Sequence, residues 1–121
     1  TDARVFDAST MLVNIGGDVE LFDQLIRLFL ERHRIMVQEI EAAIKQADGV
    51  ALERAAHSLK GTAGNLCAPE VVLLASQLEA NGRLGTLAEA PALFAQLEHT
   101  VQQLIVVLER QITPADPTEP R

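Results

Sequence analysis

Apolar residues recur every three or four positions through most of this 121-residue chain. An α-helix turns by about 100° per residue, so this spacing gathers apolar side chains on one face. The longest stripe predicts a helix that Asp18 caps and that runs to about Ala47. Its apolar positions are Phe22, Leu25, Ile26, Phe29, Met36, Val37, Ile40, Ala43, Ile44 and Ala47. The chain is therefore expected to bury its core between helices.

Three further amphipathic stripes follow, separated by short connections. They predict helices over about 50–66, 69–81 and 91–112, with Asp48-Gly49 and Asn81-Gly82 as helix stops. Four such helices favour an all-α fold, an antiparallel up-down-up-down four-helix bundle.

The two ends of the chain carry weaker signals. A short additional N-terminal helix is expected from Ser9 or Thr10 to about Ile15, stopped by Gly16-Gly17. We expect one domain over 1–112. Residues 113–121 contain three prolines and are expected to form a disordered Pro-rich tail or a linker stub.

Composition excludes several classes of function. A net charge of −7, with no Trp and no Tyr, argues against nucleic acid as a partner, because such binding needs clustered cations and stacking rings. No apolar run is long enough to span a membrane, and no signal pattern opens the chain, so we expect a cytoplasmic protein without direct membrane contact. The single cysteine, Cys67, is expected to be a small buried hydrophobe in a reducing compartment.

The helix expected over 50–66 carries the candidate site. Its core-facing stripe is Leu52, Ala55, Ala56, Leu59, Ala63 and Leu66. His57 lies about 140° from the centre of that stripe, with Lys60, Gly61 and Gly64 on the same outer surface. Each glycine costs a helix about 1 kcal/mol relative to alanine, so two of them here need a reason. Clearance for a bulky group at the imidazole supplies one, and Lys60 would suit an anion, which suggests a phosphoryl group and a docking protein.

Other chemistries fit the residues less well. A phosphate-cradling Gly-rich loop is missing, and Ser58 points away from His57 in mid-helix, which excludes a hydrolase triad. The paired ligand spacings of a metal site are absent, so we expect no metal. His33 is expected at the bundle boundary with a local partner, and His99 in solvent. Glu53, four residues before His57, would orient the imidazole or be solvated.

The run His57-Ser58-Leu59-Lys60-Gly61-Thr62-Ala63-Gly64-Asn65-Leu66, preceded by Ala55-Ala56, resembles the signature of histidine-containing phosphotransfer (HPt) domains of two-component phosphorelays. Phe6-Asp7, Gly16-Gly17-Asp18 and Leu78-Glu79 extend the likeness over nearly 5–112. Cys67 departs from the pattern, since many members carry glycine there.

The resemblance implies a phosphocarrier. His57 would accept a phosphoryl group through Nε2 from a receiver-domain aspartyl phosphate and pass it to the aspartate of a response-regulator receiver. Lys60 would stabilise the phosphoryl charge, with Arg54 a weaker candidate. Gly61 and Gly64 would let the receiver's loops close over the ring. The chain would need no cofactor and no ATP site of its own, with Mg²⁺ on the partner receiver.

Receivers would dock on exposed hydrophobes of the long helix, from about Phe29 to Met36, beside His57. A start at Thr1 without Met, together with the Pro-rich tail, suggests a terminal module excised from a hybrid sensor kinase, although a free-standing shuttle is also consistent. As an isolated domain we expect a monomer.

Two other classes stay open at this point. One is the phosphoacceptor domain of a chemotaxis-type histidine kinase, which a separate kinase domain would phosphorylate from ATP. The other is a non-catalytic helical adaptor bundle with an inert His57, in which the two glycines would be buried by helix packing.

Overall fold

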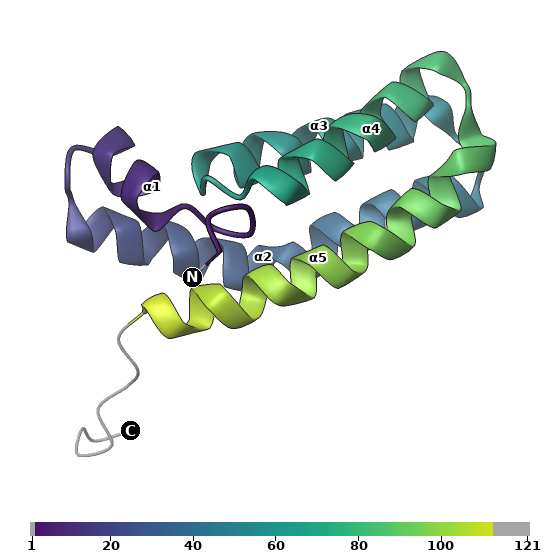
Figure 1. Cartoon of the computed structure of the whole chain (residues 1–121). Coiled ribbons are helices and arrows are strands. Elements are labelled where there is room, and N and C mark those ends of the chain that lie inside the picture. The colour runs from purple at the N-terminus through teal and green to yellow at the C-terminus, as the bar shows by residue number, and fades with distance from the viewer. Residues whose placement is uncertain (1, 113–121) are drawn as a thin grey trace.

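The computed structural model describes residues 2–112, so the expected Pro-rich tail lies outside the described residues. Five α-helices and a short 3-10 turn make up this part of the chain (Figure 1). They are α1 (Ala8–Asn14), α2 (Val19–Lys45), α3 (Gly49–Asn65), α4 (Pro69–Leu84), η1 (Leu87–Glu89) and α5 (Ala90–Gln111). The all-α prediction is confirmed, because residues 2–112 contain no strand.

Aspartates fix where three of the helices begin. Asp7, Asp18 and Asp48 precede α1, α2 and α3, and each carboxylate accepts a hydrogen bond of 3.0–3.1 Å from the backbone N–H three residues later. This arrangement satisfies one of the free N–H groups of the first turn. Helix α4 begins at Pro69 instead, where a missing N–H costs little. The predicted starts of α2 and α4 are confirmed.

The four long helices form a closed ring of neighbours, α2 with α3, α3 with α4, α4 with α5, and α5 with α2. Figure 1 shows α3 and α4 side by side above α2 and α5, with α1 folded across one end. Their apolar faces meet in one core whose largest fully buried side chains include Phe29, Ile40, Leu59, Leu78 and Leu104. No described helix has the length and apolar character needed to cross a membrane.

Helix α4 is longer than the sequence predicted. Asn81 and Gly82 do not stop it; they lie buried in its last turns, and the helix ends at Leu84 before Gly85, whose φ is +75°. Gly82 is needed for packing, because a Cβ there would lie 2.6 Å from the backbone oxygen of Gly49 and 2.6 Å from the backbone nitrogen of Glu53. The two glycines therefore let the backbones of α3 and α4 touch.

The ends of α2 and α3 each use a left-handed residue that is not glycine. Ala47 has φ +52° and Cys67 has φ +59°, and both N–H groups bond a carbonyl three residues back, at 3.1 Å. The next N–H in each case bonds a carbonyl five residues back at 3.0 Å, which completes the helix-ending motif typical of glycine. Both helices therefore end one or two residues earlier than predicted. Cys67, expected to be buried, is half-buried.

We predict that Gly82→Ala destabilises the bundle by about 2 kcal/mol or more, because α3 and α4 must separate to admit one methyl group. Gly61→Ala is the matched control, since a Cβ at Gly61 meets no atom within 4 Å. That variant should instead gain up to about 1 kcal/mol from helix propensity. Urea unfolding of both variants measures the difference, and equal stabilities would contradict the backbone contact.

Candidate functional site

His57 projects from the face of α3 that points away from the core. Its side chain is 69% exposed, whereas Leu52, Ala56 and Leu59 on the opposite face are fully buried. The predicted outward orientation of the imidazole is confirmed. Lys60, one turn further along α3, is half-buried beside it.

A carboxylate on the neighbouring helix holds the ring. Oε2 of Glu79, on α4, lies 2.6 Å from Nδ1 of His57, and Nζ of Lys60 donates to Oε1 of the same carboxylate at 2.5 Å. The Glu79 side chain is only 12% exposed. The ammonium of Lys60 holds the pKa of Glu79 below its ordinary value, and the bond from His57 adds to this effect against the opposing effect of burial.

This geometry selects one tautomer of the imidazole. An ionised carboxylate can only accept hydrogen bonds, so Nδ1 must carry the proton that it shares with Glu79. In a neutral ring the lone pair then belongs to Nε2, on the edge away from Glu79 and toward solvent. The site therefore presents an unprotonated, accessible imidazole nitrogen, which is the form that can act as a nucleophile.

Glu79 orients the imidazole, so of the two expectations for Glu53 the orienting role is wrong. Glu53 forms no hydrogen bond with His57, although it lies one turn before it on the same helix. Glu79 is 22 residues away in sequence. In the sequence, Glu79 stood out only as part of the Leu78-Glu79 pair that resembles the family. That resemblance assigned no function to Glu79.

The two glycines beside His57 are open to solvent. Gly61 and Gly64 are exposed, and a Cβ at either would meet no atom within 4 Å. Helix packing therefore does not explain them, in contrast to Gly49 and Gly82. The two glycines are thus still best explained as leaving space for a group that approaches His57. The alternative of a non-catalytic adaptor bundle required these glycines to be buried, so it loses its support.

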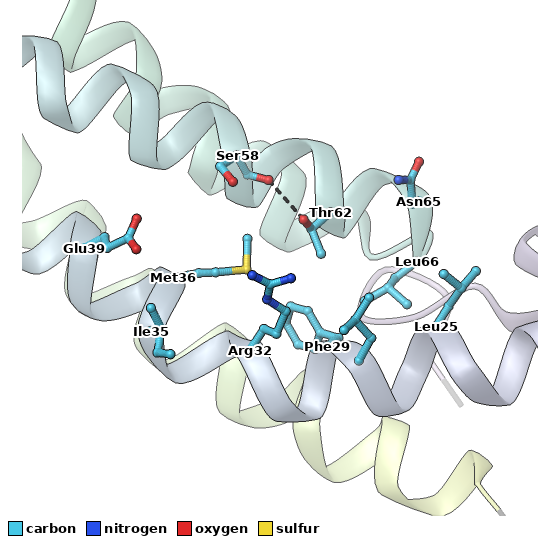
Figure 2. A pocket seen from close by; sticks show the side chains of 11 residues that line it. Leu25, Phe29, Arg32, Ile35, Met36, Glu39, Ser58, Thr62, Asn65 and Leu66 are labelled. Atoms are coloured by element: carbon cyan, nitrogen blue, oxygen red, sulfur yellow. Dashed lines mark hydrogen bonds between the residues drawn. The ribbon is translucent and has the colours of Figure 1, made fainter.

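A groove of about 370 Å³ lies between α2 and α3, and Ser58, the residue after His57, is part of its lining. Figure 2 shows Met36 and Arg32 reaching from α2 toward Ser58 and Thr62 of α3. The expected contact residue Met36 is half-buried within the groove. Arg54 is exposed and lines an adjoining depression that shares Ser58 with the groove.

The expectation for Phe29 needs a correction. Phe29 is 1% exposed, so it forms part of the groove's wall as a core residue and offers no exposed surface. Leu28 and Ile35 line the same groove and are 46% and 59% exposed. The helical stripe pointed to Phe29 because it marks the core face, whereas the exposed hydrophobes lie beside that face. The expected range of exposed hydrophobes includes Ile35, whereas Leu28 lies just outside it and was missed.

The remaining candidate ligands are dispersed. His33 is half-buried and its ring lies 5.8 Å from that of Phe29; burial lowers its pKa. His99 is exposed, as expected. Burial, with the charge of Asp7, raises the pKa of the Cys67 thiol. Over residues 2–112, no three His, Cys, Asp or Glu side chains are grouped so as to hold a metal ion.

Fold and site together define a class, a four-helix bundle that displays an exposed histidine, held by a carboxylate, on an open helix face. The chain belongs to the Hpt domain family, whose model matches residues 24–106. It is therefore a histidine-containing phosphotransfer domain, and its role is histidine phosphotransfer.

A solved structure shares the same fold. The chain is similar to histidine-containing phosphotransfer protein B (HptB) from Pseudomonas aeruginosa PAO1, with a TM-score of 0.82 and 24% sequence identity. The similarity covers 88% of this chain and 93% of that one. No curated protein matches the chain by sequence.

The lowered pKa of Glu79 predicts a loss of stability in acid. The stabilisation is complete above the carboxyl's ordinary pKa of 4.5 and is lost as the pH falls through the lower value of the folded state. Urea unfolding from neutral pH to about pH 3 should show a steeper loss for the wild type than for Glu79→Gln. Glu53→Gln, which removes a carboxylate without such partners, should behave like the wild type; parallel curves for all three would contradict the prediction.

Proposed function

We propose that this domain carries a phosphoryl group between two receiver domains. Its His57 accepts the group from an aspartyl phosphate on one receiver and donates it to the aspartate of another, a response regulator. The observation that carries the proposal is the 2.6 Å contact of Nδ1 with Glu79, because it leaves Nε2 free on a ring that is 69% exposed.

The transfer needs no acid or base from this chain. The lone pair of Nε2 forms the new N–P bond, the O–P bond of the aspartyl phosphate breaks, and its electron pair returns to the receiver's carboxylate. The ring becomes an imidazolium that keeps the Nδ1 proton. Mg²⁺ on the receiver would neutralise the phosphoryl oxygens during the transfer. Lys60 lies one turn from the imidazole and would add a further positive charge.

The groove between α2 and α3 is the docking surface that we propose for the receiver. It combines the exposed hydrophobes Leu28 and Ile35 with the half-buried Met36, and Arg32 and Glu39 supply charges along it. A patch with apolar contacts and a charged rim is typical of a specific interface that must also dissociate. Its position beside His57 would bring the receiver's active site over Nε2.

His57→Gln should abolish acceptance of a phosphoryl group while leaving the helical content intact, because the side chain is exposed. The measurement is incubation of the purified domain with a phosphorylated receiver, following the label and its lability. An acid-labile, base-stable label that the variant lacks would support the proposal. Labelling only from ATP by a separate kinase domain would favour the chemotaxis-type class, and no labelling by either route would contradict both.

Bulk at Gly61 should slow transfer more than it alters stability. Gly61→Leu places a branched side chain one turn from His57, in space that the fold leaves open. We expect a drop of at least about tenfold in the transfer rate, because misplacing reacting groups by even about 1 Å is costly. Ala95→Leu is the matched control, since Ala95 is exposed on α5, which is not a ring neighbour of α3. A normal transfer rate in Gly61→Leu would refute the clearance argument.

A further inference from the structure

The contact between Glu79 and His57 constrains the phosphorylated form as well as the free one. When Nε2 carries a phosphoryl group, a neutral ring has its only remaining lone pair on Nδ1. That lone pair would face Oε2 of an ionised Glu79 across 2.6 Å without a hydrogen atom between them. Two acceptors so placed repel each other, so the ring must either keep the Nδ1 proton or break away from Glu79.

Glu79 has little freedom to move away. Its side chain is 12% exposed, and its other oxygen is tied to Nζ of Lys60. The close backbone contact of α3 and α4 involves Gly82, one turn from Glu79 on α4, and Gly49 and Glu53 on α3, about two turns and one turn before His57. Keeping the proton on Nδ1 is therefore the alternative that the packing favours.

We propose, on the basis of the phosphocarrier function above, that Glu79 is a positioning residue that keeps the proton on Nδ1 of phosphorylated His57. The phosphorylated ring is then an imidazolium paired with a carboxylate. When a receiver carboxylate attacks phosphorus, the N–P bond breaks and its electron pair returns to Nε2. The leaving group is a neutral imidazole, a far better leaving group than the imidazolate anion that a deprotonated ring would have to release.

Other charged groups lie on the helices around His57. Carboxylates among them favour a proton on the ring, and cations disfavour it. On α3, Glu53 and Arg54 lie one turn before His57 and Lys60 one turn after it. On α4, Arg83 follows Glu79 by one turn, and on α2 Arg32 and Glu39 line the groove that Ser58 of α3 also lines. Of these, only Lys60 bonds Glu79 in the described part of the chain, where it withdraws negative charge from the carboxylate and opposes retention of the proton.

The test loads the histidine chemically, so that it needs no receiver. Phosphoramidate, a small phosphoryl donor, is applied to the full chain in a His99→Gln background, because His99 is also exposed. ¹⁵N NMR of the labelled imidazole then follows Nδ1 as the pH is raised. We expect the wild type to keep the Nδ1 proton to a pH at least about one unit higher than Glu79→Gln does.

Two further variants separate this role from simple support of the fold. Glu53→Gln removes a carboxylate on the same surface that does not contact Nδ1, so it should change the midpoint far less than Glu79→Gln. Lys60→Gln removes the cation that competes for Glu79 and should raise the midpoint. At mildly alkaline pH the phosphoryl group should hydrolyse about tenfold faster on the wild type than on Glu79→Gln, since only the protonated ring leaves readily.

Equal midpoints and equal phosphoryl lifetimes in the wild type and Glu79→Gln would overturn the inference. This outcome is separate from failure of the proposed function. If receivers exchange phosphoryl groups with His57 but the midpoints agree, the carrier function stands and the role of Glu79 falls. If the midpoints differ as expected but no receiver exchanges with the domain, the proton-holding role stands and the carrier function falls.

Discussion

The backbone contact between α3 and α4 determines what the site can be. Gly49 and Gly82 let the two helices touch, and further along the same close pair of helices Glu79 lies 2.6 Å from His57. Larger residues at the contact would move the carboxylate out of hydrogen-bond reach, because direct bonds fail beyond about 3.5 Å. The two glycines at the helix contact thus influence the chemistry of an exposed side chain that they do not touch.

Glu79 is shared between two hydrogen-bond donors, Nδ1 of His57 and Nζ of Lys60, and this sharing suits a phosphotransfer histidine. A carboxylate bound to Nδ1 alone would favour the protonated, non-nucleophilic imidazolium in the free domain. Lys60 shares the charge through Oε1, which moderates that effect while still fixing the tautomer. On a phosphorylated His57, as proposed, the phosphoryl group would offer Lys60 a competing anion. Release of Lys60 would then strengthen the hold of Glu79 on Nδ1, so the same three side chains suit both halves of the cycle.

The sequence predicted the parts of the structure that depend on local periodicity. The helix count, the cap at Asp18 and the outward face of His57 all follow from signals within one helix. The partner of His57 could not be predicted in this way, because Glu79 lies on another helix. Which residue of α4 faces His57 depends on how the two helices pack at the glycine contact. Asn81-Gly82 was misread as a helix stop for the same reason, since a glycine needed for close packing and one that ends a helix look alike in sequence.

The four helical glycines fall into two pairs, which differ in whether an added Cβ would meet the backbone of another helix. Gly49 and Gly82 have backbone within 2.7 Å of an added Cβ, so their lack of a side chain serves the fold. Gly61 and Gly64 face open space and weaken α3 for no gain in packing. A helix that keeps such residues in the turns after an exposed imidazole sacrifices stability for access. That loss is understandable only if a second molecule must approach the ring, so the open glycines themselves argue for a docking partner.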